Sequence, residues 1–87
     1  MTKTTYILIR ESSNESVYTA HPFPTETAAY TAMNCMMKSD TAAIETTYHL
    51  TPHVEQVSSY KTQLIFDAII AESDMTIKIT YSVYEVK

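Results

Sequence analysis

The clearest pattern in the sequence is an alternation of apolar and polar residues near its C-terminal end. The apolar positions are Met75, Ile77, Ile79, Tyr81 and Val83, with a polar residue between each one and the next. Side chains along a β-strand point to opposite faces in turn, so this period of two predicts a strand with one buried face. The run before it, 64–71, is apolar on both faces except at Asp67, and residues 72–74 are polar. We therefore predict a C-terminal β-hairpin.

A second β-hairpin is predicted near the N-terminus. Residues 6–9 and 16–21 are rich in isoleucine, threonine, tyrosine and valine, which favour strands. The polar residues 11–15 between them suit a turn, and Asn14 is expected at its left-handed position because the chain has no glycine. The predicted hairpin covers residues 4–21.

Between the hairpins, apolar residues recur at helical spacing. The prolines at 22 and 24 cannot donate to a strand ladder, while Thr25 can cap a helix and Glu26 suits its positive end. The apolar stripe consists of Ala29, Ala32, Met33, Met36 and Met37. This spacing predicts an amphipathic helix from Thr25 to about Ser39.

The C-terminal extent of this helix is left open by the pattern. Ile44 and Tyr48 preserve the spacing beyond Asp40, but the threonines among them weaken helix propensity. Pro52 would end any continuation. Residues 51–61 show no clear period and are interpreted as a connection.

These elements predict one small α+β domain over residues 1–87. The order is ββαββ, with one main helix packed on one face of a four-stranded antiparallel sheet. Apolar residues on both faces of the strands imply that the second face is also covered. Two covers are considered, which are the segment 40–61 and a partner protein.

The absence of glycine excludes several enzyme classes. Phosphate-binding loops, nucleophile elbows and calcium loops need positive φ or close backbone approach, which glycine provides at the lowest cost. Without glycine, we expect turns of type I at Asn14, at Ser73-Asp74 or at proline, with few strained positions. Strained positions are common in active sites, so this composition favours a binding surface over a catalytic one.

Charge and cysteine content bear on the class of ligand and on the cellular compartment. The net charge is −4 and the six basic residues are dispersed, so we expect no direct binding of nucleic acid. A single cysteine excludes an internal disulfide and favours a reducing compartment. The N-terminal apolar stretch is only four residues long before Arg10. We therefore expect a soluble, cytoplasmic protein that does not insert into a membrane.

Two groups of residues are candidate reactive centres. Glu45, His49 and His53 are spaced by four, as metal ligands on one helix face would be, but Pro52 interrupts the interval. Cys35 lies in the second half of the helix, far from the electropositive end that lowers a thiol pKa. We expect no metal site, no cofactor and no catalytic residue, and hence no enzyme. A metalloprotein built on the two histidines is the outlying alternative.

Tyrosines and acids provide the candidate contact residues. The chain has seven tyrosines, a residue type enriched at interfaces because it combines a large apolar ring with a polar tip. Asp67 has two interpretations, either a charge that prevents aggregation of strands or part of a contact surface with nearby acids. The candidate partner-binding residues are Tyr48, Tyr60, Asp67, Glu72, Asp74, Tyr81 and Tyr84.

Three segments carry a resemblance. The strand Tyr-Ile-Leu-Ile-Arg at 6–10, the helix start from Phe23 to Met33 and the ending Tyr-Ser-Val-Tyr-Glu-Val at 81–86 resemble small uncharacterised proteins of bacterial phages and mobile elements of gut bacteria. Small phage-encoded proteins of this size include anti-CRISPR and other anti-defence inhibitors, which commonly bind a host protein. The resemblance implies an inhibitor that occludes a CRISPR-type defence protein.

Two functions are therefore compared. The first is a non-enzymatic protein-binding module, of which such an inhibitor is one form. The second is a self-associating structural or accessory protein that forms a homodimer through a sheet edge or a sheet face.

Overall fold

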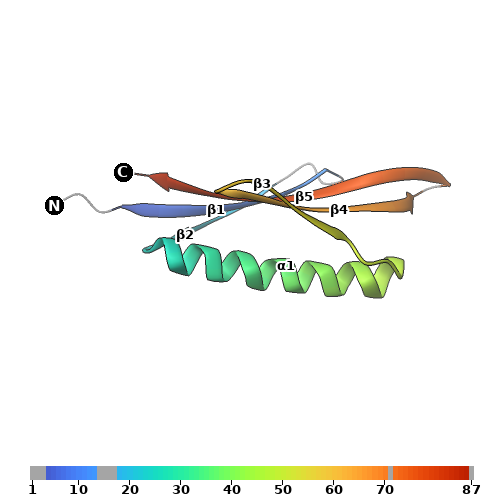
Figure 1. Cartoon of the computed structure of the whole chain (residues 1–87), viewed down its shortest axis with the longest axis horizontal. Coiled ribbons are helices and arrows are strands. Elements are labelled where there is room, and N and C mark those ends of the chain that lie inside the picture. The colour runs from blue at the N-terminus through green and yellow to red at the C-terminus, as the bar shows by residue number, and fades with distance from the viewer. Residues whose placement is uncertain (1–3, 14–17, 71, 87) are drawn as a thin grey trace.

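The structure is a computed structural model that describes residues 4–13, 18–70 and 72–86. One long helix lies along one face of a five-stranded antiparallel sheet, so the predicted α+β class is confirmed (Figure 1). The elements are β1 (Thr5–Ser12), β2 (Thr19–Phe23), α1 (Glu26–Tyr48), β3 (His53–Ser58), β4 (Lys61–Ile70) and β5 (Ser73–Val86). The strands lie in the order β2-β1-β5-β4-β3, which places the 14-residue β5 at the centre.

The prediction of four strands is wrong, because residues 53–58 form an additional strand, β3, at one edge of the sheet. Its residues are exposed except for Ser58, which is half-buried. A strand without a buried face shows no alternation of apolar and polar residues, so the sequence pattern did not reveal it. The segment interpreted as a connection therefore extends the sheet.

The N-terminal hairpin is present as β1 and β2, but its second strand ends later than predicted. Pro22 does not stop the strand, because it pairs with Ile7 and β2 continues to Phe23. β2 is an outer strand, and an edge position tolerates a residue that has no N–H to donate. The predicted turn at Asn14 lies outside the described residues.

Helix α1 has a defined cap at each end. The Thr25 hydroxyl accepts a hydrogen bond from the Ala28 N–H at 3.1 Å, which confirms the predicted N-cap. The helix continues past the region left open by the sequence, because Ile44 is buried and Tyr48 still packs against the core. His49 ends it, and its N–H donates to the Glu45 carbonyl at 3.0 Å.

Among the described residues, two adopt positive φ, contrary to the expectation of ordinary turns. His49 has φ 59° at the end of α1, and Glu72 has φ 65° in the turn that joins β4 to β5. Ser73 and Asp74, the predicted turn residues, instead begin β5 and pair with the end of β4. Left-handed backbone costs a residue with a Cβ about 1 kcal/mol, so this chain accepts strain where glycine would usually stand.

The core lies between α1 and the central strands. Its largest buried side chains include Leu8 of β1, Leu64 of β4 and Ile77 of β5, and Met33 packs on them from the helix. Within the described ranges, no helix combines the length and apolar character that a membrane crossing requires.

A polar network ties the middle of the helix to two strands. Arg10 on β1 donates to both carboxylate oxygens of Asp40 on α1, from Nε at 2.9 Å and from Nη2 at 3.0 Å. The hydroxyl of Tyr81 on β5 donates to the same carboxylate. Burial first, and then the hydrogen bond to Asp40 and its charge, raise the pKa of Tyr81 far above its ordinary 10.0, while Arg10 opposes this.

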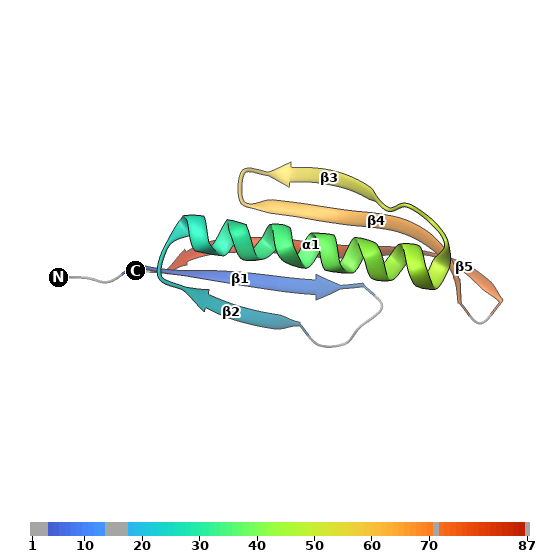
Figure 2. The same ribbon diagram turned by 90° about the horizontal axis from the view of Figure 1, so that it is seen from below.

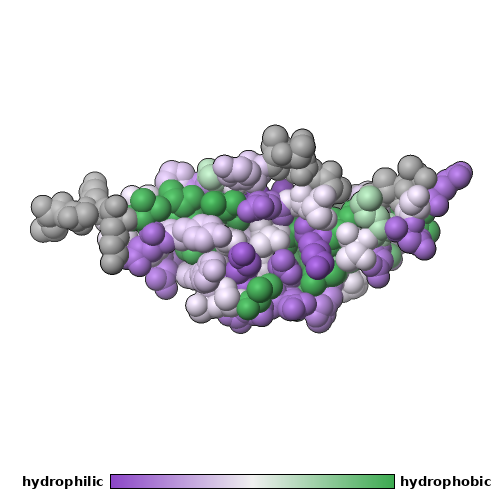
Figure 3. Space-filling view, turned by 90° about the horizontal axis from the view of Figure 1, so that it is seen from above, coloured by the Kyte–Doolittle hydropathy of each residue, from purple (hydrophilic) through white to green (hydrophobic). Residues whose placement is uncertain are grey.

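The second face of the sheet has no described element over it (Figure 1). The expectation that segment 40–61 covers this face is wrong, because its first part extends α1 on the opposite side and its last part forms β3 in the plane of the sheet. Viewed from the side away from the helix, hydrophobic residues form separate patches among polar ones (Figure 3). Ile7 and Ile9 are half-buried, and their alternation with the buried Leu8 places their side chains on this face.

Candidate functional site

The central strand β5 has an open edge at its C-terminal end. Along β5, the pairing with β4 ends at Ser82, opposite Lys61, whereas the pairing with β1 continues to Val86. Val83 donates its N–H to the Tyr60 carbonyl at 2.9 Å, in the turn between β3 and β4. Beyond this bond, no described strand lies on that side of β5, as Figure 2 shows.

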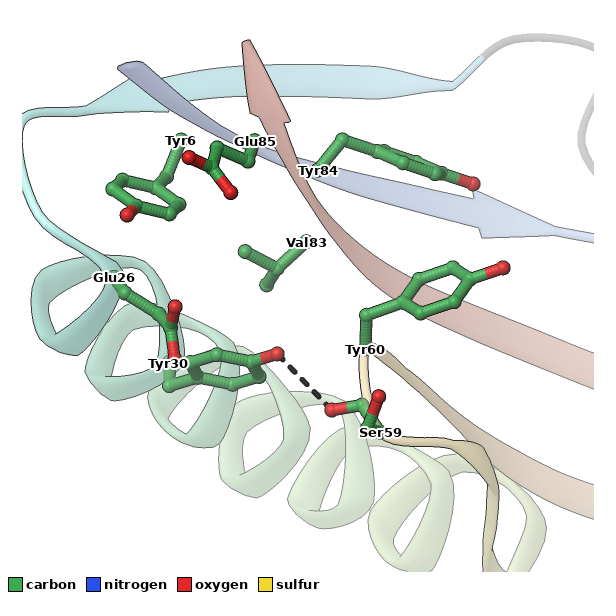
Figure 4. A pocket seen from close by; sticks show the side chains of 8 residues that line it. All are labelled: Tyr6, Glu26, Tyr30, Ser59, Tyr60, Val83, Tyr84 and Glu85. Atoms are coloured by element: carbon green, nitrogen blue, oxygen red, sulfur yellow. Dashed lines mark hydrogen bonds between the residues drawn. The ribbon is translucent and has the colours of Figure 1, made fainter. Parts of the chain in front are cut away.

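A cleft of about 470 Å³ lies between this open edge and the first turns of α1. It is lined by Tyr6, Glu26, Tyr30, Ser59, Tyr60, Val83, Tyr84 and Glu85. Figure 4 shows these side chains arriving from β1, α1, the β3–β4 turn and β5, with Val83 at the centre. Segments far apart in the sequence therefore form one site.

Aromatic contacts hold the walls of the cleft. The Tyr30 hydroxyl donates to the Ser59 carbonyl at 3.1 Å, which ties the helix to the β3–β4 turn (Figure 4). The rings of Tyr60 and Tyr84 lie 5.6 Å apart between centroids, tilted by 51°, a favourable arrangement for aromatic pairs. Tyr60 and Tyr84 are each about two-fifths exposed, and Tyr84 alternates with Val83 and Glu85 along β5, so the paired rings stand at the rim of the cleft, where they can contact a ligand without the fold opening (Figure 4).

Two carboxylates give the cleft a negative potential. Glu26 comes from the first turn of α1 and Glu85 from β5, and no Lys or Arg of the described ranges forms an ion pair with either. Desolvation, and then the charges of Glu85 and Glu26, raise the pKa of Tyr6 above its ordinary 10.0. Carboxylates and aromatic faces together attract cations, and an open strand edge accepts extended backbone.

A second cleft, of about 390 Å³, lies at the opposite end of the molecule, where the β4–β5 hairpin passes the end of α1 (Figure 2). It brings together three predicted contact residues, Tyr48, Asp67 and Asp74. Asp67 is exposed and accepts a hydrogen bond from Thr76 Oγ1 at 2.7 Å, and Tyr48 packs on Phe66 with ring centroids 5.3 Å apart.

The seven predicted contact residues thus separate into distinct places. Tyr60 and Tyr84 share the first cleft, while Glu72 lies in the turn at the tip of the β4–β5 hairpin. Tyr81 is 0% exposed and belongs to the core, so its prediction as a contact residue is corrected. Tyr81 is one of the alternating apolar positions of β5, and this pattern already indicated that its side chain lies on the buried face of the strand.

The sequence did not single out Tyr6, Tyr30, Glu26 and Glu85 as contact residues. The sequence predicts Glu26 only as a residue at the start of the helix, and in the structure it also lines the cleft. The meeting of these four side chains depends on where β4 begins relative to β5, and residue types alone carry no signal for that register.

The residues weighed as reactive centres are placed apart. Cys35 is exposed, His49 caps α1 and His53 begins β3. Among the described residues, no three histidine, cysteine or acidic side chains come together as metal ligands would.

No family model, curated protein or solved structure matches the chain. The function is therefore argued from the geometry of the cleft.

Proposed function

We propose that this protein is a non-enzymatic protein-binding module that holds a segment of its partner in the cleft between α1 and the open edge of β5. The observation that supports it most is that β4 begins only at Lys61, which leaves the β4-side edge of β5 unpaired beyond Val83, beside a cavity of about 470 Å³. Exposed tyrosines next to unpaired backbone offer both contact area and hydrogen bonds to a peptide.

Other free edges of the sheet carry features that oppose pairing with another chain. β2 contains Pro22, and the β3 ladder has a register shift between Gln56 and Ser58. β4 carries the exposed Asp67 in the part that extends beyond its pairing with β3. Prolines, bulges and charges are the usual means of protecting a strand edge. The C-terminal edge of β5 has no proline or register shift and lies in a cleft, and its charged residue, Glu85, lines that cleft, which favours it as the binding edge.

The nature of the partner rests on the resemblance to small phage and mobile-element proteins. On that basis we propose a host protein of a bacterial defence system, of the CRISPR type, as the target. The binding module would act by occlusion, since a strand and its flanking side chains held in the cleft are withdrawn from the partner's own contacts.

Affinity capture with matched variants tests the proposed function. We expect the wild type to retain a partner from a host lysate, and the double variant Tyr60→Ser/Tyr84→Ser to lose it. Tyr18→Ser is the control, because Tyr18 is a 65% exposed tyrosine that does not line the cleft. Circular dichroism of all variants checks that the fold is retained. Recovery of the same proteins with the double variant would refute the proposal.

Self-association through the open sheet face is the second candidate function. It is favoured by the half-buried Ile7 and Ile9, which no described element covers, and by the exposed Val86 near them. Light scattering on the purified chain over a range of concentrations distinguishes the two functions. A monomer at the highest concentration excludes the homodimer.

A further inference from the structure

The direction of the backbone groups on β5 defines what its open edge can bind. Within an antiparallel strand, the N–H and C=O of one residue point to the same neighbour, and successive residues point to opposite neighbours. The Lys78 carbonyl accepts from the Ser13 N–H at 2.9 Å on the β1 side, whereas the Val83 N–H donates towards Tyr60 on the β4 side. Glu85 lies two residues after Val83, so its N–H and C=O point to the same side of β5, which is the open edge beside the cleft.

The side chains around this backbone place negative charge beside it. Glu85 pairs across the sheet with Tyr6 and faces α1, where Glu26 begins the helix. Both carboxylates line the same cleft, and the rings of Tyr6 and Tyr30 lie beside them (Figure 4). A strand laid along Glu85 would direct alternate side chains into this space, between the strand and the helix.

We infer that the cleft takes an extended segment of the partner, which pairs with β5 at Glu85 as a short added strand and directs a lysine or arginine side chain between Glu26 and Glu85. This inference rests on the proposed function and names the chemistry of the segment bound. The backbone bonds supply affinity that is independent of sequence, and the two carboxylates supply the preference for a cation.

The same charges argue against a second copy of this chain as the occupant of this edge. Symmetric antiparallel pairing centred on Glu85 would set the two Glu85 side chains directly opposite each other, and like charges in that position are destabilising. The chain also carries a net charge of −4, so approach of another copy is opposed by long-range repulsion.

Titration with defined peptides, followed by nuclear magnetic resonance of the ¹⁵N-labelled full chain, tests this inference. One capped peptide alternates threonine and valine around a central arginine. A second has glutamate in place of the arginine, and a third keeps the arginine but has its alternate backbone nitrogens methylated. We expect the Glu85 amide resonance to move with the arginine peptide at about 1 mM, and the other two to bind at least ~tenfold more weakly.

Variants of the carboxylates complete the test. Glu26→Gln/Glu85→Gln should lose the preference for arginine over glutamate, while Glu55→Gln, a control on the outer strand β3, should keep it. An unmoved Glu85 resonance, equal affinity for the arginine and glutamate peptides, or undiminished binding of the methylated peptide overturns the inference.

The failure of this inference is distinct from failure of the proposed function. Lysate capture that depends on Tyr60 and Tyr84 but is unchanged in Glu26→Gln/Glu85→Gln leaves the binding module intact and overturns the basic segment. Capture that is insensitive to the tyrosines overturns the proposed function itself.

Discussion

Replacing Asp40 by asparagine tests what holds α1 in register on the sheet. Asp40 lies near the middle of the helix and accepts hydrogen bonds from Arg10 on β1 and Tyr81 on β5. Asparagine keeps the size of the side chain but removes its charge and one of its two acceptor oxygens. The change therefore weakens the contacts to two strands at once without opening a cavity.

The magnitude follows from the number and burial of these bonds. A hydrogen bond to a charged group contributes about 1.5–3 kcal/mol, and loss of one partner of a buried pair costs about 3–5 kcal/mol. The side chains of Arg10 and Asp40 are 21% and 20% exposed, so water reduces the loss. We expect Asp40→Asn to lower the free energy of unfolding by about 2 kcal/mol, which corresponds to about 8–16 °C in Tm for a domain of this size.

Urea unfolding followed by circular dichroism measures this loss. Asp67→Asn is the matched control, because Asp67 is exposed and bonds only to Thr76 among the described residues, and its cost should stay below about 0.5 kcal/mol. A double-mutant cycle of Asp40→Asn with Tyr81→Phe should give a coupling of about 1 kcal/mol. A cost of Asp40→Asn no larger than that of the control, or additive effects in the cycle, would refute the argument.

Three further predictions concern pH, a strained residue and a cap. The free energy of unfolding should fall above pH 10 more steeply in the wild type than in Tyr81→Phe, by about 1.4 kcal/mol per pH unit, because unfolding releases the Tyr81 proton that the folded state retains; parallel alkaline limbs would contradict this. His49→Gly should raise the free energy of unfolding by about 0.5–1 kcal/mol through relief of positive φ, while His53→Gly in the extended β3 should lower it; a loss in both would argue against strain at His49. Thr25→Ala should cost about 1 kcal/mol in urea unfolding and Thr25→Ser little, and equal costs would show that the hydroxyl does not act as the cap.

The strands with one buried face were predictable, because their residues record the contact they make. The alternation from Met75 to Val83 predicts β5, and in the structure Ile77, Ile79, Tyr81 and Val83 are buried under α1. The first half of the helix was predictable for the same reason, since its stripe faces the core at a period of 3.6 residues. A buried face constrains residue type, and this constraint can be read from the sequence.

The elements that the sequence did not reveal lack such a face or depend on distant partners. β3 is exposed at an outer edge, so its apolar residues, Val54 and Val57, do not follow the period of two that a buried face would impose. The second half of α1 contains unfavourable threonines, and it is helical because Ile44 and Tyr48 find contacts on the sheet. Local propensity is a weak preference that such tertiary contacts override.

The candidate site shows the same division. Tyrosine content indicated a contact surface, and two of the predicted residues, Tyr60 and Tyr84, do share a cleft. The sequence could not show that Glu26 and Glu85 meet there, because their proximity depends on where the turn at Ser59 and Tyr60 interrupts the pairing of β5. That interruption is a property of strand register, which is set by long-range packing.

The sequence by itself determined the class of the fold, the buried faces of its main strands and helix, and, because it has no glycine, the absence of glycine-dependent loop motifs. Only the tertiary structure decided the number of strands, the burial of Tyr81 with Asp40 and Arg10, and the cleft at the open edge of β5. The physical reason is the distance along the sequence between the residues that form each feature. Periodicity records the contact of each residue with the core, whereas a network or a cleft depends on which distant segments pack side by side, and residue type at one position does not encode its neighbour 41 residues away.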